Sequence, residues 1–375
     1  MDIGIIGNLI FMNKLLIVCG PTATGKTALT VQLAKRYNGE LVSADSRQVY
    51  RGMDIGTGKD LSKKFKFQIS NFKFSFKNKK YSIPKYSIDG VFLWMVDVVN
   101  PDEEFSVAHY HYLATHIIED IQKRGKLPIV VGGTGLYIQS LLSPLETSHI
   151  PPNKELRKRL QVLPVTELQE RLKKDDIAAW DQMNQSDRQN SRRLMRKIEI
   201  AEFYCHRESS FAGQGDLYSD YKNYKDYSSL LLVGLTAPYP VLYKQIDERV
   251  EKRVKEGIIK EITSLLGKGY SWNLPSMNTF GYKEWKDYFV KECAQSREAG
   301  FSFLELKKPQ FREWSAHSVQ SIIQRWKWDE HGYARRQMVW FKKMKGIHWV
   351  DIALEGWQKQ VETLIQPWYT RHAPY

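Results

Sequence analysis

Cysteines, long apolar runs and acidic residues are all scarce in this sequence. Its three cysteines, Cys19, Cys205 and Cys293, are far apart and form no CxxC pair. This spacing argues against a disulfide framework or a cysteine zinc site and fits a reducing cytoplasm. No apolar run reaches the length of a membrane span. Residues 1–11 are apolar but lack the basic start and cleavage site of a signal peptide, and Met12 could be the natural start.

The shortage of acidic residues leaves the chain strongly basic. Its 375 residues include 56 Lys and Arg against 42 Asp and Glu, which gives a formal net charge of +14. This excess favours a polyanionic partner, with nucleic acid first and an acidic membrane surface second. The length allows two or three domains with a sizeable core.

A glycine-rich loop, GPTATGKT, follows the apolar run 15–19 and precedes a predicted helix at 28–37. The loop consists of Gly20, Pro21, Thr22, Ala23, Thr24, Gly25, Lys26 and Thr27. A strand, such a loop and a helix form a P-loop, whose backbone N–H groups and helix N-terminus hold a phosphate or diphosphate. Lys26 is placed to neutralise phosphate oxygens, and the Thr27 hydroxyl to bind Mg²⁺. We therefore predict a phosphate site, with a chance match in a glycine-containing turn as the alternative.

Two polar residues follow other predicted strands of an α/β sheet. Asp45 follows a short strand at 41–42, and Thr134 lies in a Gly-Gly-Thr-Gly turn after the strand 127–131. Both would lie at the edge where parallel sheets bind ligands. Spacing alone leaves two interpretations of Asp45 open, a general base or Mg²⁺ partner and a helix N-cap. Asp97, inside the predicted strand 91–99, is the one candidate for the metal-binding acid of a P-loop kinase or other NTPase.

Residues 61–90 alternate between polar and apolar side chains, which predicts a β meander or hairpin. The segment has eight lysines and one acid, Asp89. It could be a ribbon that faces RNA, but lysines that protect a solvent face and a sheet edge are the favoured interpretation.

The remaining segments are mostly helical. Residues 151–207 predict helices interrupted near Pro164, and 188–207 carry a basic face suited to phosphate contacts or to solvent. Residues 241–266 predict one long amphipathic helix. Between 325 and 345 aromatic residues alternate with arginines and lysines, which suits stacking on unpaired bases or a helix core. We expect Trp340 and Phe341 to lie in the core and the arginines to be functional.

Taken in order, these segments resemble the bacterial-type tRNA dimethylallyltransferases, or tRNA isopentenyltransferases. The matching segments, spread over about residues 14–350, are Gly20–Thr27, Ser43–Tyr50, Gly52–Thr57, Phe105–Ala108, Gly132–Tyr137, Arg193–Ile200, Phe280–Glu284 and Ala334–Phe341. Each one alone is ambiguous, but the ordered set is specific.

The resemblance implies transfer of a dimethylallyl group from dimethylallyl diphosphate, with Mg²⁺. The acceptor is the N6 amine of adenosine 37, beside the anticodon of tRNAs that read codons beginning with U. Asp45 matches the catalytic aspartate of the family, and Thr134 its active-site threonine. The P-loop matches the diphosphate or nucleotide site, and Thr27 the Mg²⁺ ligand. Residues that match tRNA contacts are Asp45, Ser46, Arg47, Gln48, Arg193, Arg196, Gly281, Tyr282, Arg335, Arg336 and Gln337. The implied partner is the tRNA anticodon stem-loop, and we expect a cytoplasmic monomer without a membrane partner.

Three features depart from the family pattern. The segment 61–90 is longer than the usual connection, and Leu93 and Trp94 stand where the family has two histidines. Tyr239 replaces an arginine that helps to hold the diphosphate in relatives. Lys244 is our candidate substitute, and a lower affinity for the diphosphate is the alternative.

The predicted fold is α/β, with a P-loop NTPase-like core of parallel sheet, a helical insertion domain and a helical C-terminal segment. We expect the catalytic core at 12–145, the insertion that contacts tRNA at 146–209, and the rest of the core with a tRNA-binding segment at 210–375. The alternative functions are an adenine-nucleotide isopentenyltransferase, a P-loop small-molecule kinase, and a non-catalytic RNA-binding module. The last would leave the P-loop unexplained.

Overall fold

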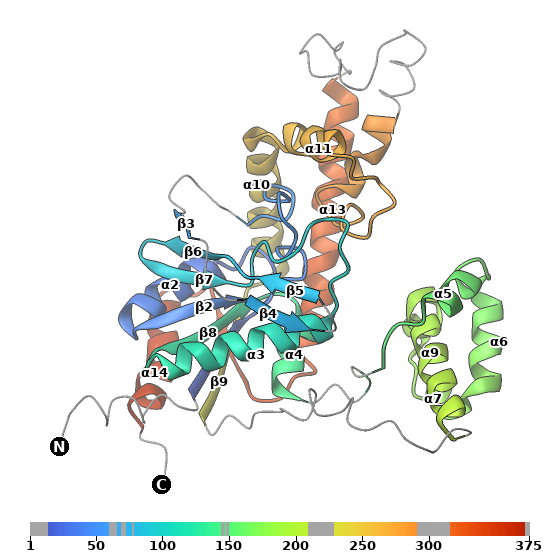
Figure 1. The fold of residues 1–375 in the computed structure, drawn as a ribbon. Helices are drawn as coiled ribbons and strands as arrows, with labels where there is room; N and C mark the ends of the chain where they lie inside the picture. The colour runs from blue at the N-terminus through green and yellow to red at the C-terminus, as the bar shows by residue number, and fades with distance from the viewer. Residues whose placement is uncertain are drawn as a thin grey trace. The chain divides into compact units, whose positions relative to one another are not determined.

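The computed structural model describes residues 14–59, 66–68, 73–76, 79–143, 147, 150–208, 229–290 and 316–371 (Figure 1). The chain divides into two compact units. The first consists of residues 1–142 and 226–375, and the second of residues 143–225.

The first unit is built on an eight-stranded sheet in the order β10-β9-β1-β8-β2-β7-β6-β3. The strands from β10 to β7 in this order run parallel to one another. Strand β6 runs antiparallel to β7, and β3 runs antiparallel to β6. All six residues of β1 are buried, as expected for a parallel strand covered on both faces. The strands are β1 (Lys14–Cys19), β2 (Gly39–Ser43), β3 (Lys66–Gln68), β6 (Lys85–Ile88), β7 (Val91–Trp94), β8 (Leu127–Gly132), β9 (Ser229–Thr236) and β10 (Ile347–Asp351). This arrangement confirms the predicted α/β core.

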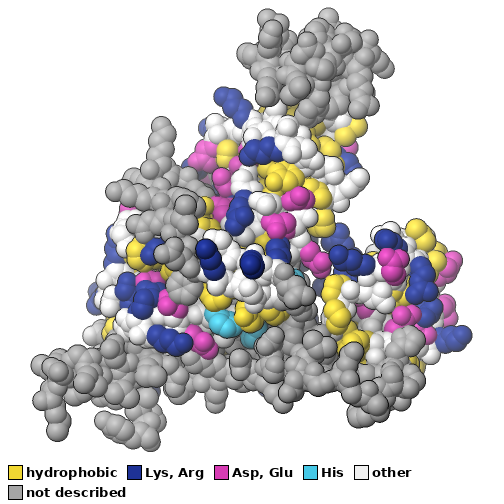
Figure 2. All heavy atoms as spheres, viewed as in Figure 1, with side chains coloured by type: hydrophobic (Ala, Val, Ile, Leu, Met, Phe, Trp, Pro, Cys, Tyr) yellow, Lys and Arg dark blue, Asp and Glu magenta, His cyan; other side chains and the backbone are white. Residues whose placement is uncertain are grey.

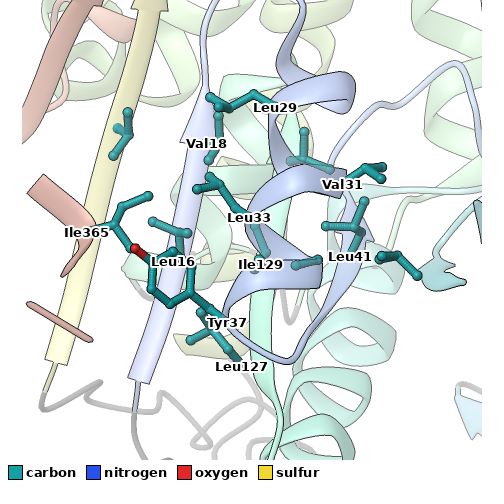
Figure 3. Close-up of a cluster of buried hydrophobic side chains, with 14 of the residues drawn as sticks. Leu16, Val18, Leu29, Val31, Leu33, Tyr37, Leu41, Leu127, Ile129 and Ile365 are labelled. Atoms are coloured by element: carbon teal, nitrogen blue, oxygen red, sulfur yellow. The ribbon is translucent and has the colours of Figure 1, made fainter. Parts of the chain in front are cut away.

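Helices cover both faces of the sheet (Figure 1). Helices α2 (Lys26–Arg36) and α14 (Trp357–Thr370) pack on one face, where Leu16, Leu33 and Ile365 belong to one buried apolar cluster (Figure 3). Helices α3 (Val107–Lys123) and α4 (Gly135–Leu142) cover the other face. Each fully buried leucine stabilises the fold by about 1.5–3 kcal/mol, so this packing holds the P-loop between two fixed elements.

A second apolar core lies between four further helices among the described residues of this unit. Helix α10 (Tyr239–Glu256) packs against α13 (Ala316–Phe341), and both contribute to a buried cluster with α11 (Ile258–Gly267) and the 3₁₀ helix η2 (Lys283–Trp285). The predicted single helix at 241–266 is wrong. Gly257, with φ of 103°, ends α10 and begins α11, because this left-handed conformation is open to glycine but strained for other residues.

The described residues of the lysine-rich segment form strands, as predicted, while 61–65, 69–72 and 77–78 lie outside the described residues. Its strands β4 (Lys73–Phe76) and β5 (Lys79–Ser82) form a hairpin, while β3 and β6 extend the main sheet. The hairpin packs on α3 through Phe76, whose ring stacks on that of Tyr112 at 4.5 Å. The predicted strand 91–99 is wrong beyond Trp94, because Met95 and Asp97 have positive φ angles of 65° and 56°.

The second unit is helical, with five helices among its described residues. Its buried core includes Leu156, Leu168, Leu172 and Leu194. The helices are α5 (Lys154–Leu160), α6 (Val165–Asp175), α7 (Ile177–Asp181), α8 (Gln185–Arg188) and α9 (Ser191–Glu208). Basic and acidic side chains both lie on the face of this unit that Figure 2 shows. In the described part of the chain, no helix combines the length and apolar character needed to cross a membrane.

Candidate active site

The P-loop connects the end of β1 to the start of α2. Gly25, with φ of 74°, is the N-cap of α2, and Gly20 has φ of 136°. A Cβ atom at Gly20 would lie 2.2 Å from the carbonyl oxygen of Leu235, so only glycine fits there. The Thr24 hydroxyl donates to the carbonyl of Pro21 at 3.0 Å and tightens the turn. The sequence therefore folds locally into the predicted loop at a helix N-terminus, an arrangement that favours phosphate groups.

Lys26 is half-buried and lies over the loop. Its Nζ donates to the carbonyl oxygen of Pro21 at 2.5 Å and to Oγ1 of Thr24 at 3.3 Å. Burial, and then the nearby positive charge of Arg249, lower the pKa of Lys26 from 10.5 to about 8, although Asp45 partly opposes this change. An anion bound at the loop would favour the charged form of this lysine.

A cavity of about 480 Å³ opens beside the P-loop. Its walls come from the P-loop, the residues after β2, residues 57–59, the end of β8, and helix α10. Apart from the P-loop, its charged lining residues are Asp45, Arg47, Lys59, Glu248, Arg249 and Lys252. The cavity therefore combines an anion-binding loop, additional cations and two carboxylates, Asp45 after β2 and Glu248 on α10.

Helix α10 supplies cations that the sequence analysis missed. The lining residues Gln245, Glu248, Arg249 and Lys252 follow the i, i+3, i+4, i+7 spacing of one helix face, a pattern visible in the sequence. Arg249 donates from Nη1 to Oγ1 of Thr22 at 3.1 Å and from Nη2 to the carbonyl of Gly58 at 2.7 Å. Lys244, our candidate substitute for the missing arginine, is exposed and does not line this cavity. The geometry therefore favours Arg249 and Lys252, which line the cavity, over Lys244 for this role.

Asp45 lies in the cavity wall two residues after β2 ends. Its Oδ1 accepts from the backbone N–H of Arg47 at 2.9 Å and lies 3.8 Å from Nε of the same residue. The helix N-cap alternative is wrong, because residues 46–49 form turns and no helix begins there. The carboxylate lines the same cavity as the loop that would hold a phosphate group.

Thr134 holds the segment that follows Asp45. Its Oγ1 accepts from the backbone N–H of Ser46 at 3.0 Å and donates to Oγ of Ser46 at 3.2 Å. Its own backbone N–H donates to the carbonyl of Ala44 at 3.0 Å. Thr134 is therefore next to the cavity rather than in its described lining.

Gln337 connects helix α13 to the P-loop. Its Oε1 accepts from the backbone N–H of Thr22 at 2.9 Å, and its Nε2 donates to the carbonyl of Gly133 at 2.8 Å. The residue is 5% exposed. Through these two hydrogen bonds it connects two walls of the cavity. The resemblance alone placed this residue along the tRNA.

The other residues matched to tRNA contacts differ in exposure. Arg335 and Arg336 are exposed on α13, Ser46 and Gln48 are half-buried, and Arg47 is 6% exposed.

Gly281 and Tyr282 support a neighbouring loop. Tyr282 is fully buried, and its hydroxyl donates to Oε1 of Glu261 at 2.6 Å. The Glu261 carboxylate also accepts from the backbone N–H groups of residues 54–56. A Cβ atom at Gly281 would lie 2.4 Å from the carbonyl oxygen of Gly56. This segment therefore packs under the loop that carries the cavity residues 57–59.

Arg193 and Arg196 lie on α9 of the helical unit. Arg196 donates to the carbonyl oxygens of Thr147 and Ile150 at 2.7 and 2.9 Å, and the exposed Arg193 pairs with Asp187.

Asp97 is part of a buried ion pair. Its carboxylate accepts from Nζ of Lys59 and from the hydroxyl of Tyr86, and Lys59 also donates to Oδ1 of Asp54 at 2.7 Å. Asp97 does not line the described cavity. These partners argue against a role for Asp97 as the metal-binding acid of a kinase. Among the residues that the structure describes, no group of three or more His, Cys, Asp and Glu residues is arranged to hold a metal ion.

Comparison with known proteins gives the same assignment as the motifs. A family model described as IPP transferase matches residues 48–344, and one described as isopentenyl transferase matches residues 13–70. The tRNA dimethylallyltransferase of Roseiflexus sp. (strain RS-1) is 33% identical over 363 residues, covering 95% of this chain and 99% of the relative. That of Thermoanaerobacter sp. (strain X514) is 33% identical over 340 residues, covering 90% and 91%.

Solved structures have the same fold. The crystal structure of the tRNA isopentenylpyrophosphate transferase from Bacillus halodurans matches with a TM-score of 0.58 and 30% identity, over 95% of this chain and 97% of that one. A eukaryotic dimethylallyltransferase acting on tRNA matches with a TM-score of 0.63 and 22% identity, over 95% of this chain and 77% of that one. The family model covers most of the chain, and the curated relatives match it almost from end to end. The chain therefore belongs to the IPP transferase family.

Proposed function

We propose that this chain is a tRNA dimethylallyltransferase. It transfers the dimethylallyl group of dimethylallyl diphosphate to the N6 amine of adenosine 37, in tRNAs that read codons beginning with U. The observation that carries the proposal is one cavity that combines a P-loop, the cations Lys26, Arg249 and Lys252, and the carboxylate of Asp45. The end-to-end match to curated tRNA dimethylallyltransferases supports tRNA as the acceptor.

The P-loop side of the cavity binds the diphosphate. The bond between C1 of the allyl group and the diphosphate oxygen breaks, and the leaving diphosphate keeps the electron pair. Backbone N–H groups of the loop, the ammonium of Lys26 and the guanidinium of Arg249 stabilise this developing negative charge. The cations of α10 take the role of the arginine that Tyr239 replaces.

The residues beside the P-loop fit a Mg²⁺ ion that arrives with the diphosphate. The Thr27 side chain is exposed at the start of α2 and lines the cavity. No cage of three or more protein carboxylates and imidazoles is needed, because Mg²⁺ commonly binds one or two protein ligands, substrate phosphates and water. Thr27 would hold the ion, and the ion would supply positive charge to the diphosphate oxygens.

The Asp45 side of the cavity binds the acceptor. The N6 amine of adenine is a weak nucleophile, because its lone pair is delocalised into the ring. As nitrogen forms its bond to C1, the Asp45 carboxylate accepts the amine proton. Thr134 holds Ser46 in place through two hydrogen bonds and so fixes the segment that carries the base.

Arg335 and Arg336 are exposed on α13, the helix that also supplies Gln337 to the cavity lining, and an anticodon stem-loop is a polyanion. An unpaired base of the anticodon loop leaves its stack at lower cost than a base in a duplex. We propose that Arg335 and Arg336 of α13 contact the loop, together with Ser46 and Gln48. Arg193 and Arg196 bring the helical unit of residues 143–225 to the tRNA, which gives the predicted insertion domain its role. A monomeric state and a cytoplasmic location remain predictions.

Acceptor competition tests the proposal. Radiolabelled dimethylallyl diphosphate and Mg²⁺ are incubated with a U-decoding anticodon stem-loop, the same stem-loop with guanosine at position 37, and AMP. We expect label on the adenosine stem-loop alone, and loss of that label in Lys26→Ala. Label on AMP alone would identify a nucleotide prenyltransferase, and rapid ATP hydrolysis without any transfer would identify an NTPase.

A further inference from the structure

A buried cluster of charges lies between the acceptor side of the cavity and helix α13. Glu330 of α13 accepts from Nη1 of Arg253 at 3.2 Å and from Nη1 of Arg47 at 3.4 Å. The side chains of Glu330 and Arg253 are each 2% exposed, and that of Arg47 is 8% exposed. Three elements that are distant in the sequence therefore meet at one carboxylate.

Glu330 is ionised in this cluster. Burial by itself raises the pKa of a carboxyl group, but the positive charges of Arg47 and Arg253 hold the pKa of Glu330 below its ordinary value. A buried carboxylate between two guanidinium groups is costly to desolvate, and removal of one partner leaves the others uncompensated. An arrangement of this cost suggests a function beyond packing.

The cluster ends at the proposed base. Arg47 contacts Glu330 on one side, while its Nε lies 3.8 Å from Oδ1 of Asp45 on the other. The guanidinium also lies over the ring of Tyr333, 4.6 Å from its centroid. Glu330 and Tyr333 are three residues apart on α13, so they occupy one face of that helix. Helix α13 therefore holds the guanidinium of Arg47 from two directions.

We propose that Glu330 is a positioning residue that keeps the guanidinium of Arg47 directed toward α13 and away from a close ion pair with Asp45. A close ion pair would reduce the tendency of the Asp45 carboxylate to accept a proton. With Glu330 in place, this carboxylate remains able to take the proton of the acceptor amine as the C–N bond forms. The inference rests on the proposed function, because it concerns the base of that reaction.

The test is a double-mutant cycle between Glu330 and Arg47. In Glu330→Gln we expect kcat for transfer to the stem-loop to fall about 10- to 100-fold, as is typical when a reacting group is misplaced. If Glu330 acts through Arg47, the double variant should have a kcat no lower than that of Arg47→Gln alone. The guanidinium that Glu330 restrains is absent from both proteins. Contact alone can also couple two residues, so KM for the stem-loop and the free energy of unfolding are measured in parallel. A purely structural role would raise KM or lower the free energy of unfolding, whereas the positioning role lowers kcat.

Glu251→Gln is the matched control. Glu251 of α10 pairs with Lys327 of α13 at 2.7 Å, so the variant removes a carboxylate between the same two helices. Glu251 is outside the cavity lining and its side chain is 53% exposed, so we expect wild-type kcat in this variant. Should Glu330→Gln not fold, the cycle is run with Glu330→Asp, whose shorter side chain moves the carboxylate away from Arg47.

Two results would overturn the inference and leave the function standing. One is a Glu330 variant with kcat within threefold of wild type while Asp45→Asn is inactive. The other is a double variant in which the two single losses multiply. If the wild-type protein transfers no label to the stem-loop, the proposed function itself fails.

Discussion

The pKa of Lys26 predicts a pH dependence for the capture of dimethylallyl diphosphate. Only the charged ammonium stabilises an anion, and burial near Arg249 lowers the pKa of this lysine to about 8. Lys26 is therefore charged below pH 8 and loses its charge as the pH rises through that value. Because kcat/KM for the diphosphate reports on the enzyme before the diphosphate binds, we expect it to fall above pH 8.

The size of the effect follows from the same pKa. A group with a pKa of about 8 is about 90% charged at pH 7 and about 10% charged at pH 9, so kcat/KM should fall about tenfold between them. An ordinary lysine, with a pKa of about 10.4, would lose only a few per cent of its charge over this range. Arg249 lowers the pKa of Lys26, so Arg249→Gln should move the midpoint to higher pH while weakening diphosphate binding.

The assay is label transfer at saturating stem-loop and low dimethylallyl diphosphate, measured from pH 6.5 to pH 9.5. Lys26→Arg is the control, because arginine stays charged throughout and should give lower activity with a flat profile. A flat profile for the wild-type protein would refute the reasoning. A midpoint near pH 8 that persists in Lys26→Arg would also refute it, because another group would then be titrating.

Three other variants test the packing and the surface. Gly133→Ala should lower kcat/KM for the diphosphate about tenfold. The new Cβ would lie 2.2 Å from Nε2 of Gln337 and displace this side chain. Loss of its hydrogen bond to the P-loop residue Thr22 costs about 0.5–1.5 kcal/mol or more. Trp326→Ala should destabilise the fold by about 3–5 kcal/mol in denaturant unfolding, because this side chain is fully buried. Arg335→Gln should weaken stem-loop binding and reduce the slope of log affinity against log salt by about one, as loss of one phosphate contact would.

The glycine and tryptophan variants each have a control that changes the same residue type elsewhere. Gly267→Ala introduces a Cβ with no atom within 4 Å and should keep wild-type kcat/KM. Trp328→Ala, at a side chain that is 63% exposed, should change stability by no more than about 0.5 kcal/mol. Equal effects within a pair would contradict the packing argument. An Arg335→Gln protein with unchanged salt dependence would exclude this arginine from the RNA contact.

The parts of the site that could be predicted from the sequence are local. The P-loop needs a strand, a loop and a helix in immediate succession, and Asp45 follows directly after a strand, so chain order alone places both at one sheet edge. Gly257, where α10 ends and α11 begins, marks a possible helix end in the sequence. The amphipathic pattern continues on both sides of it, however, and so predicts one continuous helix. Local periodicity does not record a change of direction.

The parts that could not be predicted depend on contacts between distant residues. Arg47 and Glu330 are separated by 283 positions, and Gln337 reaches Thr22 across 315. The sequence around each of these residues does not indicate which distant residue it contacts. Arg249 was missed for a different reason, because the family pattern has its arginine at the start of α10, whereas Arg249 lies nearly three turns further along that helix.

The central claim is that Asp45 removes the proton of the acceptor amine in a cavity that has already bound the diphosphate. The most direct test is the single-turnover rate of label transfer from bound dimethylallyl diphosphate to the adenosine stem-loop, compared between wild type and Asp45→Asn. Asparagine keeps the shape of the side chain but does not act as a base at neutral pH. We expect the rate to fall by about 10²- to 10⁴-fold while diphosphate affinity stays within about threefold of wild type. A rate within a few-fold of wild type would contradict the claim.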